Sequence, residues 1–187
     1  MARTPSTMIP LGTLAPPFSL PDTLSGKTTS LAELRGENGT VVMFICNHCP
    51  FVKHINSELI NLAHTYQSKS IGFVAISSND VETYPEDGPE KMKAVGTDLK
   101  YPFPYLYDET QVVAKAYDAA CTPDFFVFDG KLSLVYRGQL DDSRPGNMIP
   151  VTGHDIRQAL EALLSGRPVS LEQKPSIGCN IKWKTNG

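Results

Sequence analysis

The stretch from Val41 to Pro50, with the sequence VVMFICNHCP, constrains the fold of this chain more than any other. Residues 40–45 are apolar or β-branched and carry no charge, which is typical of a buried strand. Beyond Pro50, apolar side chains recur at spacings of three and four residues, at Phe51, Ile55, Leu59, Leu62 and Tyr66. This period predicts an amphipathic helix, in which Pro50 is tolerated because it falls in the first turn. The stretch therefore predicts a strand that turns directly into a helix.

Cys46 and Cys49 stand at this expected turn, in the sequence Cys-Asn-His-Cys. The first N–H groups of a helix have no backbone partner, and together with the helix dipole they favour a thiolate over a thiol. Because the thiolate is the reactive form of cysteine, the pattern favours a redox-active dithiol. We expect Cys46, as the outer cysteine, to lie near the surface and to have a pKa below the roughly 8.5 of a free cysteine.

Two other interpretations of the cysteine pair are a structural zinc site and inert core cysteines. Zinc needs four ligands, and no second close pair with finger-like spacing exists among the remaining cysteines and histidines. The remaining cysteines and histidines are Cys121, Cys179, His48, His54, His64 and His154. Inert core cysteines are disfavoured because a helix start leaves at least Cys46 near the surface. We therefore expect no metal and no cofactor.

The overall composition is that of an ordinary globular protein, with 187 residues and 41% apolar content. The net charge of −3 provides no general attraction to nucleic acid or to an anionic membrane, so neither is an expected partner. No apolar stretch approaches the roughly 20 residues of a membrane span. Residues 1–10 show no signal-peptide pattern, so a cytoplasmic location is expected.

Turn and capping signals indicate the remaining elements. Residues 18–20 and 27–29 flank a turn cluster and predict a small hairpin, and Ser30-Leu31-Ala32-Glu33 matches a capping box that begins a short helix ending at Gly36. Asp129-Gly130 predicts a hairpin turn between two strands. The expected strands lie over 71–77, 125–128 and 132–137, and the expected helices over 90–99, 109–119 and 155–164.

Strands separated by helices predict parallel crossovers, to which the hairpin adds an antiparallel pair. We therefore expect an α/β protein with a mixed central sheet and helices on both faces, in a single domain over residues 1–187. The core is expected over about 15–164, after an extended arm over 1–14. The tail over 166–187 shows no strong period.

This arrangement resembles the three-layer thioredoxin fold. The strand, the Cys46-Asn47-His48-Cys49 turn and the helix carry the resemblance, as does Thr122-Pro123, which matches the Thr–cis-Pro element of the fold. Phe18-Ser19-Leu20-Pro21 is similar to the extended start of the TlpA and AhpC/TSA branches. Residues 44–50, 121–129, 137–142 and 177–184 are similar to the peroxiredoxin-like subgroup of thioredoxin-family proteins.

The resemblance implies a thiol–disulfide oxidoreductase, in which Cys46 attacks a substrate disulfide and Cys49 resolves the mixed disulfide. Its partners would be a protein or small-molecule disulfide and a thiol reductant or oxidant. Protonated His48 would stabilise the Cys46 thiolate, unless it is only a solvated loop histidine. Thr122 and Pro123 would present backbone to the substrate, and the proline would keep a metal away from the dithiol.

Several positions depart from the related families. Gly39 and Met43 stand where peroxiredoxins carry Pro and Thr before the attacking cysteine, and Pro123 stands where they carry Arg. Thr40 stands where thioredoxins carry a buried Asp. A thiol peroxidase with Cys46 as the peroxidatic cysteine is therefore the alternative function. A metal chaperone is the third, but copper-carrying relatives use Cys-x-x-x-Cys, a longer spacer than the one here.

Other candidate residues have two interpretations each. For Cys121, the sequence favours an inert buried cysteine over a further redox cysteine. For Cys179, it favours neither a redox role nor simple packing in the tail. Arg137 and Asp141-Asp142 are expected to be solvated turn residues. The aromatic residues over 101–107 are expected to pack in the core, and His54 and His64 to lie on a helix surface.

Overall fold

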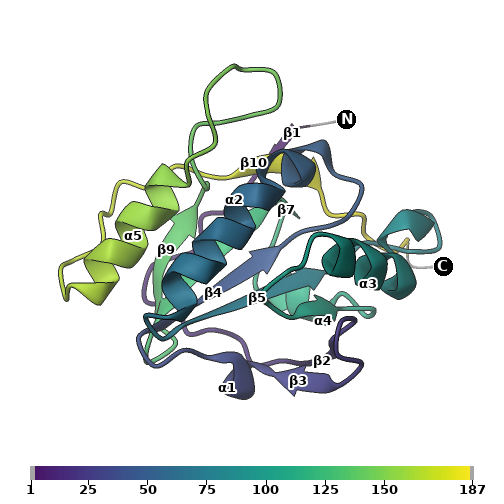
Figure 1. Ribbon diagram of the computed structural model, residues 1–187, viewed down its shortest axis with the longest axis horizontal. Coiled ribbons are helices and arrows are strands. Elements are labelled where there is room, and N and C mark those ends of the chain that lie inside the picture. The colour runs from purple at the N-terminus through teal and green to yellow at the C-terminus, as the bar shows by residue number, and fades with distance from the viewer. Residues whose placement is uncertain (1–2, 186–187) are drawn as a thin grey trace.

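The computed structural model of the chain describes residues 3–185 (Figure 1). Its strands are β1 (Arg3–Pro5), β2 (Ser19–Pro21), β3 (Thr28–Ser30), β4 (Gly39–Phe44), β5 (Ile71–Ser77), β6 (Tyr105–Tyr107), β7 (Cys121–Thr122), β8 (Asp124–Asp129), β9 (Leu134–Gly138) and β10 (Ile177–Asn180). Its helices are α1 (Leu31–Leu34), α2 (Pro50–Gln67), α3 (Pro89–Asp98), α4 (Val112–Ala116) and α5 (His154–Leu164), with a 3₁₀ turn η1 (Pro85–Asp87).

The central sheet has five strands in the order β6-β5-β4-β8-β9. Strand β4 pairs in parallel with β5, which pairs in parallel with β6, whereas β8 runs antiparallel to both β4 and β9. Every residue of β4 is buried, because this strand has a neighbour on each edge and side chains packed on each face. The expected mixed sheet is therefore confirmed, with the cysteine-bearing strand at its centre.

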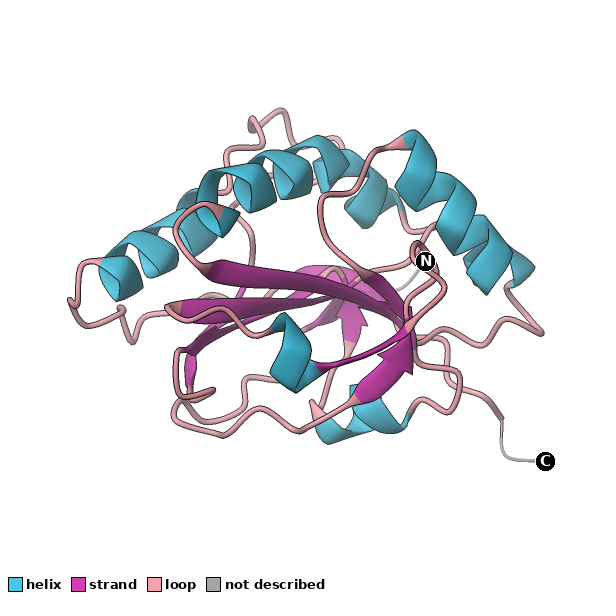
Figure 2. Cartoon of the chain, turned by 60° about the horizontal axis from the view of Figure 1, so that its bottom comes forward, coloured by secondary structure: helices cyan, strands magenta, loops and turns pink. Residues whose placement is uncertain are grey.

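Alternating side chains of β4 build the two halves of the core. Val41 and Met43 pack with residues of α2, α3 and α5, while Val42 and Phe44 pack with residues of α1 and α4. Figures 1 and 2 show the long helices on one face of the sheet and the short helices on the other. The three layers place the C-terminal end of β4, and with it the cysteines, beside the start of α2.

A second, smaller sheet joins both ends of the chain, in the order β1-β10-β7. Strand β10 runs antiparallel to β1 and to β7, with Cys179 opposite both Arg3 and Thr122. The sequence did not predict this sheet, because strands of two to four residues are too short to show a period. The tail and the arm are thus paired parts of the fold rather than irregular extensions.

The local predictions near the N-terminus are confirmed. Strands β2 and β3 form the expected hairpin, with Ser19 opposite Ser30. Ser30 caps α1 in a capping box with Glu33, as the sequence pattern required. The helix expected over 109–119 is shorter, because Gln111 and Asp118 have positive φ angles of 62° and 50° and confine α4 to Val112–Ala116.

The expectation of a solvated Arg137 is wrong. Arg137 is fully buried in β9, where its guanidinium lies 3.0 Å from the Asp124 carboxylate and 3.7 Å from the centre of the Phe126 ring. Burial raises the pKa of Asp124 and lowers the pKa of Arg137, so the loss of solvation outweighs the attraction between the two charges. The pair links the two antiparallel strands inside the core.

The loop after β9 is held by a second buried carboxylate. Asp141 is buried, contrary to expectation, because its oxygens accept hydrogen bonds from the backbone N–H groups of Ser143, Thr152 and Gly153. Asp142 is exposed, as expected, and pairs with Lys174 at 2.9 Å. Within residues 3–185, no helix is long and apolar enough to cross a bilayer.

Candidate active site

The two cysteines lie where β4 passes into α2. Cys49 is the N-cap residue of α2 and Pro50 is its first helical residue, as the sequence predicted. Among the described residues, the four cysteines are thiols that form no disulfide with one another. Cys46 is only 2% exposed, so the expectation that it lies near the surface is wrong. Its sulfur is covered by neighbouring side chains, among them Thr122 and His48.

Thr122 contacts both sulfurs of the pair. Its hydroxyl Oγ1 lies 3.4 Å from Cys46 Sγ, and its carbonyl accepts a hydrogen bond from Cys49 Sγ at 3.1 Å. The peptide bond from Thr122 to Pro123 is cis, as the resemblance implied. The backbone of this element is already used within the chain, since Thr122 pairs with Cys179 and the Pro123 carbonyl accepts from Ser176 Oγ at 2.7 Å. The tail thus occupies the edge that was expected to receive substrate.

Cys179 is brought to the dithiol by this pairing. Its sulfur lies 3.0 Å from Cys49 Sγ, and the residue is 1% exposed. Cys121 is also buried, but its sulfur contacts the Pro123 carbonyl at 3.6 Å. Burial raises the pKa of Cys121, and the nearby Asp124 carboxylate adds to this effect. The geometry therefore groups Cys46, Cys49 and Cys179, while Cys121 has the surroundings of an inert cysteine.

Hydrogen bonds among the sulfurs decide where a negative charge rests. Hydrogen bonds from Cys46 and Cys179, with the N–H groups of Val52 and Cys179, lower the pKa of Cys49 to about 5 against the effect of burial. The same bond to Cys49, then burial and the Asp87 carboxylate, raise the pKa of Cys46. These shifts run opposite to the expected acidic Cys46 thiol, which stays a prediction for alkylation to test. These contacts favour Cys49 over Cys46 as the thiolate, whereas the hydrogen bond from Cys49 to the Thr122 carbonyl exists only while Cys49 is protonated.

His48 is held by Asp87, which belongs to η1. Nδ1 of His48 lies 2.6 Å from Asp87 Oδ2 and 3.9 Å from Cys46 Sγ, and the ring stacks on Tyr84 with centroids 5.3 Å apart. With 13% of its side chain exposed, His48 is not a solvated loop residue. The backbone N–H groups of Asn47 and His48 donate to Asp87 Oδ1 at 2.8 and 3.2 Å. One buried carboxylate therefore fixes the turn between the cysteines.

Comparison with protein families matches residues 11–137 to the AhpC/TSA family. The chain belongs to the AhpC/TSA family. A crystal structure of an uncharacterized conserved protein from Geobacillus kaustophilus is 62% identical, with a TM-score of 0.98, over 100% of this chain and 99% of that one. A hypothetical protein from Sinorhizobium meliloti is 49% identical, with a TM-score of 0.95, over 98% of this chain and 100% of that one.

A putative thioredoxin from Neisseria meningitidis is 25% identical, with a TM-score of 0.62, over 81% of this chain and 89% of that one. This likeness confirms the predicted thioredoxin-like α/β fold. Comparison with curated proteins gave no match. The AhpC/TSA family and these neighbours indicate redox chemistry of the thioredoxin type.

Within this AhpC/TSA chain, the positions that depart from peroxiredoxins serve the core. Gly39 begins β4 with a φ of +156°, and a Cβ there would lie 2.7 Å from the Phe128 carbonyl. Met43 is fully buried among the side chains under α2. Arg137, the buried arginine of the next hairpin, is already paired with Asp124. Gly39 and Met43 thus make packing contacts at the positions where a peroxiredoxin carries Pro and Thr.

Two supporting residues were missed by sequence analysis. Asp87 lies in a loop rich in proline, glycine and acid, where nothing local distinguishes it from a solvated carboxylate. Asn79 donates to Asp87 Oδ2 at 2.8 Å and accepts from the Lys182 N–H at 2.8 Å. Asn79 therefore connects the tail to the carboxylate that holds the cysteine turn. The predicted packing of the aromatic stretch is confirmed, and Tyr105 also donates to Asn47 Oδ1 at 3.1 Å.

The same residues offer three donor atoms to a metal. One atom each of Cys46, His48 and Asp87 lies within 4.8 Å of the others. Nδ1 of His48 and Oδ2 of Asp87 already bind each other, and Asn79 binds the same carboxylate oxygen. A metal would have to replace both hydrogen bonds. In this structure, hydrogen bonds from Asn47 and His48 to Asp87 support the turn between the two cysteines.

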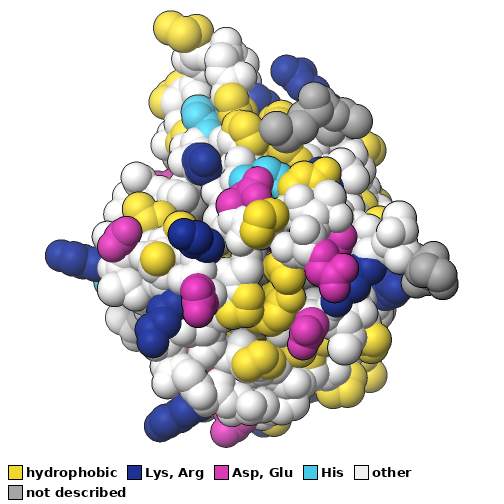
Figure 3. All heavy atoms as spheres, turned by 90° about the vertical axis from the view of Figure 1, so that its right-hand side faces the viewer, with side chains coloured by type: hydrophobic (Ala, Val, Ile, Leu, Met, Phe, Trp, Pro, Cys, Tyr) yellow, Lys and Arg dark blue, Asp and Glu magenta, His cyan; other side chains and the backbone are white. Residues whose placement is uncertain are grey.

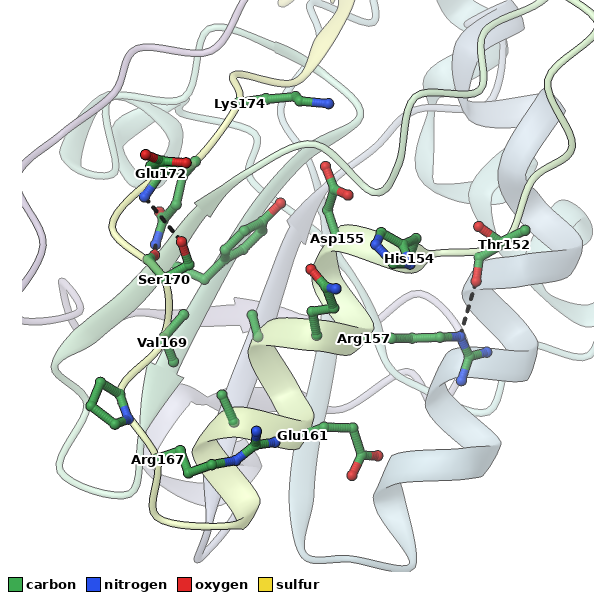
Figure 4. A pocket seen from close by; sticks show the side chains of 16 residues that line it. Thr152, His154, Asp155, Arg157, Glu161, Arg167, Val169, Ser170, Glu172 and Lys174 are labelled. Atoms are coloured by element: carbon green, nitrogen blue, oxygen red, sulfur yellow. Dashed lines mark hydrogen bonds between the residues drawn. The ribbon is translucent and has the colours of Figure 1, made fainter.

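A surface hollow of about 770 Å³ lies apart from these residues, between α5 and the segment after it (Figure 4). Charged side chains that include Arg157, Glu161, Glu172 and Lys174 line it, but no cysteine does. On the face shown in Figure 3, acidic and basic side chains are interspersed with hydrophobic ones. His54 and His64 are exposed on α2, as predicted.

Proposed function

We propose that this chain is a thiol–disulfide oxidoreductase in which Cys46 and Cys49 alternate between dithiol and disulfide. The observation that carries the proposal is the position of Thr122, whose hydroxyl lies 3.4 Å from Cys46 Sγ and whose carbonyl lies 3.1 Å from Cys49 Sγ. One residue therefore holds both sulfurs of the pair side by side at the start of α2. Membership of the AhpC/TSA family supports a redox role for them.

In the first step, Cys46 attacks one sulfur of a disulfide in a protein or small molecule. The proton on Cys46 passes to the Cys49 thiolate, so that Cys46 becomes the nucleophile. A bond forms from Cys46 Sγ to the substrate sulfur as the substrate disulfide breaks. The leaving thiolate then takes the proton from Cys49.

In the second step, the Cys49 thiolate attacks Cys46 Sγ and releases the other substrate sulfur, which takes a proton from water. Two electrons have then passed to the substrate, which leaves as two thiols, and Cys46–Cys49 is a disulfide. A thiol reductant returns the dithiol. The reverse sequence oxidises a substrate dithiol. A Cys46–Cys49 potential near −270 mV would indicate a reductant, and one near −120 mV an oxidant.

A peroxidase with Cys46 as the peroxidatic cysteine is less well supported. A peroxidatic cysteine needs a stable thiolate beside cationic or hydroxyl groups that polarise the peroxide. Here the interaction with Cys49, then burial and the Asp87 carboxylate, raise the pKa of Cys46, and Arg137 is paired with Asp124. The Thr122 hydroxyl, 3.4 Å from Cys46 Sγ, is a partner of the kind a peroxiredoxin uses.

The proposal is tested by reduction of insulin disulfides with dithiothreitol as the source of electrons. We expect wild-type protein to accelerate the reaction, and both Cys46→Ser and Cys49→Ser to lose the acceleration. In single turnover, Cys49→Ser should accumulate a mixed disulfide on Cys46, because the resolving sulfur is missing. Cys121→Ala is the matched control, since its sulfur contacts the Pro123 carbonyl at 3.6 Å. Wild-type protein that leaves insulin unreduced but consumes hydrogen peroxide rapidly would favour the peroxidase function over the oxidoreductase function.

A further inference from the structure

We propose that Cys179 is a third redox cysteine, which attacks the Cys46–Cys49 disulfide at Cys49 and leaves the oxidised protein with a Cys49–Cys179 disulfide and a Cys46 thiol. The inference rests on the proposed function, because that function supplies the first disulfide. It gives the C-terminal strand a chemical role at the same site.

The positions of the three sulfurs carry the inference. Cys49 Sγ lies 3.0 Å from Cys179 Sγ, about 1 Å beyond the length of a disulfide bond. Thr122 contacts Cys49 Sγ through its carbonyl at 3.1 Å and Cys46 Sγ through its hydroxyl at 3.4 Å, so the three sulfurs gather around this one residue. A Cys49–Cys179 disulfide therefore needs only a small side-chain movement.

The tail is built to hold Cys179 in this position. Strand β10 is paired on one side with β1 and on the other with β7, where Cys179 lies opposite Thr122. The preceding Gly178 approaches Thr122 so closely that a Cβ would lie 2.0 Å from the Thr122 carbonyl oxygen. After the strand, the Ile181 N–H donates to the Ala120 carbonyl at 3.1 Å.

This pairing removes the entropic objection to a cysteine so distant in the chain. A flexible tail would lose chain entropy when its end is brought back to Cys49. Here folding has already placed Cys179 against Cys49, 130 positions away. Strand β10 also occupies the edge beside the cis peptide bond. The tail therefore presents a cysteine to the dithiol as a bound substrate strand would.

The exchange step is balanced and needs no outside oxidant. The Cys179 sulfur forms a bond to Cys49 Sγ, the Cys46–Cys49 bond breaks, and Cys46 leaves with the electron pair. The proton that Cys179 gives up is taken by Cys46. One thiol and one disulfide are present before and after the step, so the oxidation state of the protein is unchanged.

The negative charge at Cys49 makes Cys179 less reactive in the reduced protein than in the protein with a Cys46–Cys49 disulfide. In the reduced protein, burial, then the hydrogen bond and the negative charge of Cys49, raise the pKa of Cys179 to about 12. In a Cys46–Cys49 disulfide, Cys49 carries no charge. The hydrogen bond and the negative charge of Cys49 then no longer raise the pKa of Cys179. Cys179 therefore ionises more readily once there is a disulfide to attack.

The consequence is that the oxidised protein keeps a thiol at Cys46. The disulfide is then held between two fully buried residues, and Cys46 returns it to the Cys46–Cys49 position by attacking Cys49 in the reverse exchange.

The test is disulfide mapping of wild-type protein oxidised with oxidised dithiothreitol, with remaining thiols blocked by N-ethylmaleimide in acidic denaturant. Trypsin places Cys46 and Cys49 together in the peptide 36–53 and Cys179 in the peptide 158–182. A Cys46–Cys49 bond closes a loop within one peptide, whereas a Cys49–Cys179 bond links the two. We expect linked peptides with N-ethylmaleimide on Cys46.

Two variants and one control complete the experiment. Cys179→Ala should lose the linked peptides and the label on Cys46 but still form the Cys46–Cys49 loop, which reports the proposed function separately. Cys46→Ser should form the Cys49–Cys179 link directly, and Cys121→Ala should match wild type. Wild-type protein with only the Cys46–Cys49 loop, together with free thiols at Cys49 and Cys179 in oxidised Cys46→Ser, would overturn the inference. If no protein forms the loop, the proposed function itself fails.

Discussion

The Asp87 carboxylate lies 2.6 Å from Nδ1 of His48, and its other oxygen accepts the backbone N–H groups of Asn47 and His48. Asn79 donates to the same carboxylate at 2.8 Å. The turn that carries the two cysteines is therefore held by a fully buried anion from a loop 39 positions away. This anion also faces Cys46, whose pKa it raises.

Asp87→Asn should loosen the turn and make Cys46 more acidic. The amide has one acceptor oxygen and an NH₂ group that faces N–H donors, so we expect a loss of about 1–3 kcal/mol in the free energy of unfolding. Removal of the negative charge should also increase the rate at which iodoacetamide labels Cys46 near neutral pH. Urea unfolding and peptide mass spectrometry measure the two effects. Asp98→Asn, at an exposed position on α3, is the control; equal labelling of Cys46 in both variants would contradict the role given to Asp87.

The reduced protein should hold a thiolate on Cys49 at neutral pH. The pKa of Cys49 is lowered to about 5, so absorbance at 240 nm should rise as the pH passes through about 5, and Cys49→Ala should lose this step. The folded pKa lies below the unfolded value, so this group contributes stability that is complete above the unfolded pKa and is lost as the pH falls through about 5. A step that survives in Cys49→Ala and disappears in Cys46→Ala would place the charge on Cys46 instead.

The buried pair of Arg137 and Asp124 should be important for stability although it is not part of the dithiol. Arg137→Met leaves the Asp124 carboxylate buried without a cation, which we expect to cost about 3–5 kcal/mol in urea unfolding. Adding Asp124→Leu should restore most of the loss, because it removes the unpaired charge. Lys69→Met breaks an ion pair whose side chains are 43% and 50% exposed, and should change little. Equal losses in the free energy of unfolding for Arg137→Met and Lys69→Met would contradict the difference expected between the buried and the exposed ion pair.

Hydrogen peroxide should oxidise Cys46 slowly. The interaction with Cys49 and burial raise the pKa of Cys46, and the arginine of the neighbouring hairpin is paired with Asp124. Stopped-flow mixing of reduced protein with peroxide, followed by blocking and peptide mapping, measures the rate at each cysteine. We expect Cys46 to react no faster than an ordinary cysteine thiol. A rate typical of an efficient peroxidase, abolished by Thr122→Val, would show that the Thr122 hydroxyl suffices.

The expected elements that are confirmed depend on residues close together in the chain. The uncharged run before Cys46 formed the central strand, and the three-and-four spacing after Pro50 formed α2. The capping box at Ser30 and the turn at Asp129 are likewise local patterns. Each depends on hydrogen bonds or periodic burial within a few residues, so the sequence determined where these elements begin and end.

The tertiary structure alone decided which distant groups meet at the dithiol. Nothing near Cys179, Asp87 or Arg137 in the sequence distinguishes a packed residue from a solvated one. Cys179 reaches Cys49 because a short strand in the tail pairs with β7, and Asp87 is buried because four donors converge on its oxygens. The sequence by itself determined the redox pair and its place at a helix start. The charge on Cys49, the burial of Cys46 and the third sulfur depend on long-range packing, because the fold removes these groups from water and sets their distances.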